Sequence, residues 1–239
     1  MLTLDDFVEK RSLSTEAAEW LTDAVAAKVN LVVSGGTLSG KTAMVRALAY
    51  KVPANERLIT IENMRELHLS SSRERVTTLV ERDEASGGGG VSLRDLVINA
   101  LRMRPGRIIV DEVRGPECFD VLQAFSTGHE GGLFTVHAHD VNTTVKMRIP
   151  SIAKMTEGVD IDTARKETVF AVEVVIQVER TPSGKRVVRE ISTIDPDPSD
   201  WSKLVIQPVW LRVDGGELTR VGQPGSRVAT KFATASSFK

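Results

Sequence analysis

Residues Gly35–Thr42 read GGTLSGKT, which matches the phosphate-binding pattern G-x-x-x-x-G-K-[ST] at every fixed position. An apolar, β-branched stretch, residues 30–34, precedes this motif, and a stretch with helical character, residues 41–51, follows it. Glycines let the backbone fold tightly enough for successive N–H groups to point at phosphate oxygens, and the positive end of the next helix favours the same anion. The sequence therefore predicts a strand, a loop and a helix that bind a nucleoside triphosphate.

The whole loop is expected to contribute to nucleotide binding. Its residues are Gly35, Gly36, Thr37, Leu38, Ser39, Gly40, Lys41 and Thr42. We expect Lys41 to reach the β- and γ-phosphates of ATP and the Thr42 hydroxyl to ligate Mg²⁺. The alternative, a glycine turn before an ordinary helix, is disfavoured because the strand, the loop, the Lys-Thr pair and the helix are all in place.

A second motif places acids directly after a predicted buried strand. The run Ile108-Ile109-Val110 is continuously apolar and leads into Asp111 and Glu112, which is the form of a Walker B element. We expect Asp111 to bind Mg²⁺, directly or through water, and Glu112 to polarise the attacking water. Such a run is common at strand ends, so its weight comes from the phosphate loop upstream.

Two more residues follow predicted strands. Glu62 ends the strand at residues 58–61, on the carboxyl edge where open α/β sheets bind ligands, and it is either a catalytic residue or a solvated strand-end carboxylate. His137 follows the strand at residues 133–136, and we expect it to sense the γ-phosphate. A metal site with His139 is not expected, because no clear further ligand accompanies the pair.

Three arginines flank the acidic motif: Arg102, Arg104 and Arg114. One interpretation makes them surface charges. The other makes at least one of them a phosphate contact that can reach into a neighbouring subunit, and on this basis we predict Arg102 and Arg114 as nucleotide-binding residues.

The composition limits the class of protein. The chain has 239 residues, with 31 Lys and Arg against 32 Asp and Glu, and a formal net charge of −1. Nucleic acid is therefore not expected as a partner, since there is no global basic field. Cys118 is the only cysteine, which excludes an internal disulfide and fits a reducing cytoplasm. No apolar run approaches the roughly 18 residues of a membrane span, and residues 1–10 lack the character of a signal sequence.

Alternating strand and helix patterns predict an α/β fold, namely a RecA-like P-loop NTPase sheet covered by helices. After Pro150 the pattern changes to strands separated by turn residues, which predicts C-terminal β-hairpins. We expect a P-loop ATPase domain at residues 1–190 and a β-hairpin appendage at residues 191–224. Residues 225–239 are small and polar, which predicts a disordered tail.

Four blocks of sequence together resemble the secretion traffic ATPases that power type II and type IV secretion, pilus assembly and conjugation, and in particular their CpaF/TadA branch. The blocks are residues 31–43 (LVVSGGTLSGKTA), 57–67 (RLITIENMREL), 100–117 (ALRMRPGRIIVDEVRGPE) and 127–138 (TGHEGGLFTVHA). They occur in the family's order and spacing, and the resemblance covers about residues 2–190.

The resemblance implies roles for three residues: Glu62 belongs to the family's Asp box, Glu112 is its Walker B glutamate, and His137 is its His-box histidine. It also implies a hexameric ring that hydrolyses ATP to move its subunits. Such a ring would lie in the cytoplasm, against the inner face of the cell membrane, and would drive a membrane-embedded secretion or pilus platform protein.

The chain departs from the family pattern at three positions and in length. Leu38 replaces a usual glycine, Asn63 replaces the acid after Glu62, and Asp111 replaces another usual glycine. Only 34 residues precede Gly35, so we expect this chain to lack the family's large N-terminal domain, which a full-length ATPase or a separate chain could supply. The phosphates would then be well held, while the base and ribose stay largely open to water.

The leading interpretation is an ATP-hydrolysing motor subunit. A non-hydrolysing or regulatory nucleotide-binding subunit that joins a full-length ATPase ring is the alternative, and Leu38 and Asn63 favour it. A DNA-translocating motor is a third class, and the net charge near zero argues against it.

Overall fold

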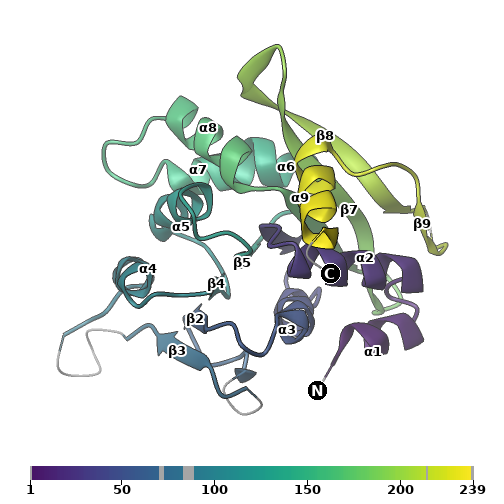
Figure 1. Ribbon diagram of the computed structural model, residues 1–239, viewed down its shortest axis with the longest axis horizontal. Helices are drawn as coiled ribbons and strands as arrows, with labels where there is room; N and C mark the ends of the chain where they lie inside the picture. Colours follow the sequence, from purple (N-terminus) through teal and green to yellow (C-terminus); the bar gives the residue numbers. More distant parts are fainter. Residues whose placement is uncertain (1, 70–72, 83–88, 214, 238–239) are drawn as a thin grey trace.

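The computed structural model describes residues 2–69, 73–82, 89–213 and 215–237, and in these residues nine strands form one sheet in the order β3-β2-β4-β5-β1-β6-β7-β8-β9 (Figure 1). The strands are β1 (Leu31–Gly35), β2 (Leu58–Glu62), β3 (Val76–Val80), β4 (Arg107–Val110), β5 (Leu133–Val136), β6 (Val174–Arg180), β7 (Arg186–Asp197), β8 (Asp200–Arg212) and β9 (Leu218–Arg220). The first six strands in this order, from β3 across to β6, run parallel, whereas β6, β7, β8 and β9 pair antiparallel. The predicted α/β sheet is confirmed.

Helices cover both faces of this sheet and enclose two separate cores. The longer helices are α2 (Thr15–Ala26), α3 (Lys41–Lys51), α4 (Leu93–Arg102), α5 (Glu117–Ser126), α8 (Ile161–Ala171) and α9 (Ser226–Ser236). The shorter ones are α1 (Leu4–Glu9), α6 (Val141–Thr143), the π-helix η3 (Thr144–Arg148) and α7 (Ile149–Ala153). One core joins α1, α2 and α3 to the sheet, and the other joins α4, α5, α7 and α8 to the opposite face (Figure 1). Side chains alternate across a strand, so each buried strand serves both cores.

The helix starts follow from capping residues in the sequence. The Ser14 hydroxyl accepts a hydrogen bond from the backbone N–H of Ala17 and begins α2. Ser92 and Asp95 form a capping box at the start of α4, in which Asp95 takes the position usually held by a longer acid. Each cap satisfies N–H groups that the first turn of a helix leaves unpaired.

The C-terminal hairpins belong to the same sheet. The first predicted hairpin is confirmed as β6 and β7, and the second as β8 and β9. The sequence boundary placed at residue 190 falls inside β7, because this strand pairs with β6 on one side and with β8 on the other. Residues 186–212 therefore extend the nucleotide-binding sheet.

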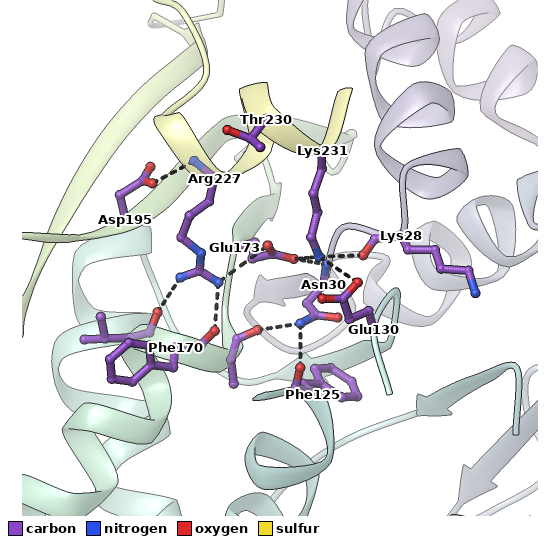
Figure 2. Close-up of polar contacts among 12 residues, drawn as sticks. Lys28, Asn30, Phe125, Glu130, Phe170, Glu173, Asp195, Arg227, Thr230 and Lys231 are labelled. Atoms are coloured by element: carbon purple, nitrogen blue, oxygen red, sulfur yellow. Dashed lines mark hydrogen bonds and ion pairs between the residues drawn. The ribbon is translucent and has the colours of Figure 1, made fainter. Parts of the chain in front are cut away.

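The predicted disorder of residues 225–239 is wrong for Ser226–Ser236, which form α9. Gly225 at its N-cap offers no side chain, but Asp195 of β7 accepts hydrogen bonds from the Arg227 N–H and the Ser226 hydroxyl. Lys231 and Arg227 also form ion pairs with the buried Glu173 (Figure 2). Contacts from distant parts of the chain therefore fix a helix that its own composition does not predict.

No helix within the described ranges combines the length and the apolar character needed to span a bilayer.

Candidate nucleotide site

The phosphate loop lies between the end of β1 and the start of α3, at the carboxyl edge of the parallel strands. Gly40 adopts a φ of 101°, which is a left-handed conformation that favours glycine. A Cβ atom at Gly35 would lie 2.4 Å from the Val178 carbonyl oxygen and 2.5 Å from the Ser39 hydroxyl. The motif glycines are therefore required by this backbone, as the sequence predicts.

Leu38 sits at the crest of the loop with a φ of 59°, although it is not a glycine. Its carbonyl accepts a hydrogen bond of 2.9 Å from the Arg186 guanidinium at the start of β7. Its side chain is 64% exposed. The replacement of glycine is thus accommodated by an external hydrogen bond, at the conformational cost of about 1 kcal/mol that a left-handed residue carries.

Lys41 is folded back over the loop. Its ammonium donates hydrogen bonds to the carbonyls of Gly35 and Gly36, at 3.2 and 3.1 Å. Burial lowers the pKa of Lys41, and the charges of Glu112 and Asp111 oppose this effect. A buried ammonium that holds only neutral carbonyls is well placed to exchange them for phosphate oxygens.

Asp111 follows β4 and is buried, with only 8% of its surface exposed. Its Oδ1 atom has no hydrogen-bond partner within the described residues. Burial, together with the charges of Glu66 and Glu62, raises the pKa of Asp111 from its ordinary value of 3.8 to about 7. Buried acids normally have partners, so this carboxyl oxygen is available to a cation.

Thr42 and Asp111 fit the Mg²⁺ ion that the fold class implies. A hydrogen bond to the Asp111 carboxyl involves the Thr42 side chain, which also lies 3.4 Å from Glu66 Oε2. Magnesium prefers oxygen ligands and is commonly bound by one or two protein groups together with nucleotide phosphates. The unpaired Oδ1 of Asp111 is an oxygen of the required kind at the required place.

Glu112, Arg114 and His137 line the same cleft as the loop. Arg114 donates a hydrogen bond of 3.0 Å to Glu112, whose side chain is 21% exposed. Burial alone would raise the pKa of Glu112, but the bond from Arg114 and the charge of Lys41 outweigh it and lower the pKa. Burial and the charge of Lys41 lower the pKa of His137, which favours its neutral imidazole. The predicted acid, arginine and histidine are therefore brought together.

Glu62 is not among the residues that line this cleft; it accepts hydrogen bonds from the loop that follows β2. It is 1% exposed, and its Oε2 accepts hydrogen bonds of 2.8 Å from the backbone N–H groups of Glu66 and Leu67. Its Oε1 accepts a third from the Thr60 hydroxyl. Glu62 is therefore not a solvated strand-end carboxylate, and its hydrogen bonds hold the loop that carries Glu66 beside Thr42.

The structure explains why an asparagine, and not the family's usual acid, stands at position 63. The Asn63 amide donates a hydrogen bond to Glu81, and the other oxygen of Glu81 accepts from the Leu93 N–H. A carboxylate at position 63 would face the carboxylate of Glu81, and like charges this close repel.

Arg102 lies away from the phosphate loop of its own chain. It lies in the last turn of α4, just before β4 begins, whereas the phosphate loop lies where β1 ends. Because β4 and β1 belong to the parallel part of the sheet, these two places are on opposite edges. A contact between Arg102 and phosphates on this chain's own loop is therefore wrong.

Three polar residues that line the cleft are not predicted by the sequence motifs: Glu66, Arg148 and Arg186. Glu66 lies four residues after Glu62, inside a block that the resemblance already covers. Arg148 ends η3, and Arg186 begins β7, so their places depend on how distant elements pack. No local signal identifies either arginine.

The fold and this cleft define a phosphate-loop nucleotide-binding protein. A family model described as "Type II/IV secretion system protein" matches residues 3–189, and the chain belongs to that family. It is similar to the type IV secretion system protein PtlH of Bordetella pertussis, with 36% identity over 68% of this chain and 48% of the relative. It is also similar to the conjugal transfer protein TrbB of Rhizobium radiobacter, with 29% identity over 82% of this chain and 57% of the relative.

A solved structure agrees with the family assignment. The VirB11 ATPase from the Brucella suis type IV secretion system, in complex with sulphate, superimposes with a TM-score of 0.68. It is 26% identical, and the match covers 83% of this chain and 56% of that structure. The chain thus spans about half the length of the relatives it matches. The resemblance to secretion ATPases that the four sequence blocks indicate is confirmed.

Proposed function

We propose that this chain binds Mg-ATP at its phosphate loop and hydrolyses it as a motor subunit of a type IV secretion, type II secretion, pilus-assembly or conjugation machine. The observation that carries this proposal is the pairing of a phosphate loop with the buried Asp111, whose Oδ1 atom has no hydrogen-bond partner among the described residues. An ammonium in the cleft and a free carboxyl oxygen beside Thr42 suit a phosphate chain with its cation.

Each residue of the cleft has a distinct proposed role. Lys41 leaves the loop carbonyls and binds the β- and γ-phosphates, and Thr42 and Asp111 hold Mg²⁺, which neutralises charge on the phosphate oxygens. Glu112 takes the proton of the attacking water, for which its lowered pKa keeps it ionised. Arg114 releases Glu112 and turns towards the phosphates, and His137 contacts the γ-phosphate.

We place the working protein in a ring of identical or related subunits, in the cytoplasm and against a membrane platform protein. The relatives described above belong to secretion and conjugation systems, and this supports the placement. Native mass measurement with and without ATP tests the ring and gives its size.

Glu112→Gln tests the proposed chemistry. The amide keeps the shape but cannot accept the proton, so steady-state ATP turnover should fall roughly 10²- to 10⁴-fold while ATP still binds. The matched control is Glu157→Gln, which changes an exposed glutamate far along the chain and should leave turnover unchanged. Full turnover in Glu112→Gln would remove Glu112 from the role of base.

A non-hydrolysing regulatory subunit is the second candidate, and the ion pair between Arg114 and Glu112 favours it. An arginine that stays on the base would hold the proton acceptor away from water. Arg114→Gln distinguishes the two candidates: in a motor, it removes a phosphate contact and lowers turnover, whereas in a silenced subunit it frees Glu112 and raises turnover.

A further inference from the structure

A cavity of about 900 Å³ lies between η3, α8 and β8, and it shares no lining residue with the phosphate cleft. The β7–β8 hairpin projects from the sheet beside α8 and supplies one wall (Figure 1). This wall, which contains Asp200, Lys203 and Leu204, lies beyond residue 189, where the match to the family model ends. The cavity is therefore formed where the C-terminal strands of this chain pack against η3 and α8, which lie inside that match.

The walls of this cavity are predominantly cationic. Its charged side chains are four cations and two acids, namely Lys146, Arg165, Lys166, Lys203, Asp162 and Asp200. Arg165 forms an ion pair of 3.1 Å with Asp162, and Lys203 forms one of 3.0 Å with the other acid. The exposed Lys146 and Lys166 form no ion pair with a described residue. The cavity thus carries an excess of positive charge in a chain whose formal net charge is −1.

The floor of the cavity is apolar. Val145 of η3 and Val169 of α8 belong to the core and are 0% and 1% exposed. Leu204 of β8 is partly buried and packs against the same core. An apolar floor between separated cations suits a ligand that carries apolar and anionic groups in turn, which is a property of polypeptide segments.

We propose that this cavity docks an acidic segment of a partner protein, with an apolar side chain on the floor and carboxylates on Lys146 and Lys166. Clusters of cations commonly recognise acidic motifs in this way. A hollow between three elements favours a polypeptide over a membrane, because a planar bilayer meets protruding cations. Nucleic acid is disfavoured because its closely spaced phosphates would also meet Asp162 and Asp200.

The π-helix η3 connects this docking surface to the phosphate cleft. Lys146 lines the cavity, and Arg148, two residues later, lines the cleft. The hydroxyls of Thr144 in η3 and Ser34 in β1 share a hydrogen bond of 2.7 Å, directly before the phosphate loop. Mg-ATP brings negative charge to the Arg148 end of η3, so it weakens the binding of an acidic segment at the Lys146 end; this link rests on the proposed function.

Fluorescence anisotropy with a labelled peptide, in which glutamates flank single leucines, tests the docking surface. The full chain should bind it at least about tenfold more tightly than the same peptide with glutamine for glutamate, and about 0.5 M salt should remove most of this difference. Lys166→Glu should weaken the acidic peptide at least about fivefold, because attraction becomes repulsion. The control Lys154→Glu makes the same change at an exposed lysine outside the cavity, and the affinity should stay within about twofold.

Equal affinities for the two peptides would overturn the docking surface, and so would equal weakening by Lys166→Glu and Lys154→Glu. Phosphatidylserine vesicles and a single-stranded DNA oligonucleotide test the other partners. If either binds and is lost in Lys166→Glu, while the acidic peptide shows no selective binding, the surface belongs to a membrane or a nucleic acid and the proposal is wrong.

Saturating Mg-ATP tests the link through η3. It should weaken the acidic peptide about threefold, and Lys41→Ala, which weakens nucleotide binding at the loop, should reduce this effect. If calorimetry shows that ATP binds but the peptide affinity is unchanged, or if Lys41→Ala leaves the effect intact, the link is wrong and the docking surface stands. If ATP does not bind, the proposed function fails, and the comparison of the two peptides still decides the docking surface.

Discussion

Glu173 and Asp111 are buried carboxylates at opposite edges of the parallel sheet, and their surroundings differ. At the edge where the strands begin, Glu173 is 3% exposed and accepts hydrogen bonds from the Asn30 N–H and the Lys231 ammonium, while Arg227 forms an ion pair with it (Figure 2). At the edge where the strands end, Asp111 is 8% exposed and leaves Oδ1 unpaired among the described residues.

The two carboxylates therefore have different roles: Glu173 holds a helix in place, and Asp111 is available to a ligand. Removing one partner from a buried ion pair is strongly destabilising, and here the ion pairs of Glu173 dock α9 onto the start of β1 and β6. A buried charge without a partner costs stability unless a ligand supplies the missing charge. We therefore expect the ligand to bind at the edge that holds Asp111, and five substitutions test the contrast.

The largest change in stability is expected from a substitution at Glu173. Glu173→Gln leaves Lys231 and Arg227 beside an amide, so the free energy of unfolding should fall by about 3 kcal/mol, at the low end for a broken buried pair because both cations are partly exposed. Urea denaturation measures it. The exposed-site control Glu157→Gln should change stability by less than about 0.5 kcal/mol. If Glu173→Gln is as mild as this control, the ion-pair cluster does not hold α9.

Neutralising Asp111 in the same way should raise the free energy of unfolding instead of lowering it. The folded state raises the pKa of Asp111 to about 7, so folded molecules keep a proton that unfolded ones lose, and stability falls as pH rises from about 4 to 7. Asp111→Asn removes this cost, which at about 1.4 kcal/mol per pH unit is at most about 4 kcal/mol. We expect a gain of about 2 kcal/mol at pH 8 without nucleotide.

The gain from Asp111→Asn should shrink as the pH is lowered from about 7 towards 4, because the folded state holds the proton in this range and the free-energy cost of taking it up falls as the pH approaches the unfolded pKa. Urea denaturation between pH 5 and 8 follows it, and Asp162→Asn, at a solvent-exposed aspartate, should show no such trend. A loss of stability at pH 8 would mean that Asp111 has a partner that offsets the cost of its burial.

Lys41→Ala should weaken phosphate binding at the edge that holds Asp111. Without its ammonium, the triphosphate loses its main cationic partner, and the dissociation constant for Mg-ATP should rise at least tenfold, which is about 1.4 kcal/mol. Titration calorimetry measures the change against Lys154→Ala, an exposed lysine with no expected role. Unchanged ATP affinity in Lys41→Ala would place the nucleotide elsewhere.

The smallest effect concerns backbone strain at the two edges. Leu38 and Arg104 both have left-handed φ angles, 59° and 53°, and replacing either with glycine should raise stability by about 0.5 kcal/mol. Only Leu38→Gly should also change nucleotide affinity, because only Leu38 lies in the phosphate loop. Calorimetry on both variants would contradict this if Arg104→Gly altered ATP binding equally.

Local sequence was enough to predict the phosphate loop, the acids after β4 and the histidine after β5. Each depends on a few adjacent residues: glycines permit the tight turn, an apolar run makes the buried strand, and the strand end delivers the next side chain to the carboxyl edge. Parallel strands bring these ends together wherever they lie in the chain, so Lys41, Glu112 and His137 meet as expected.

Which polar residues belong to the site depends instead on how the chain folds. Glu62 has the sequence position of a catalytic acid, but three donors from its own neighbourhood occupy it, and Glu66 takes the place beside Thr42. Arg186 reaches the loop, while Arg102 lies at the far edge, because strand order and not distance along the chain sets which elements meet.

Helix α9 makes the same point for the fold. Most of its residues are small or polar, and this composition favours disorder, although Val228 and Phe232 pack against the core. Asp195 supplies the cap that Gly225 lacks, and Glu173 supplies the charge that fixes Lys231, both from strands or loops far back in the chain. Local sequence sets what a segment can form, whereas the free energy that makes it form comes here from partners that only the folded chain brings near.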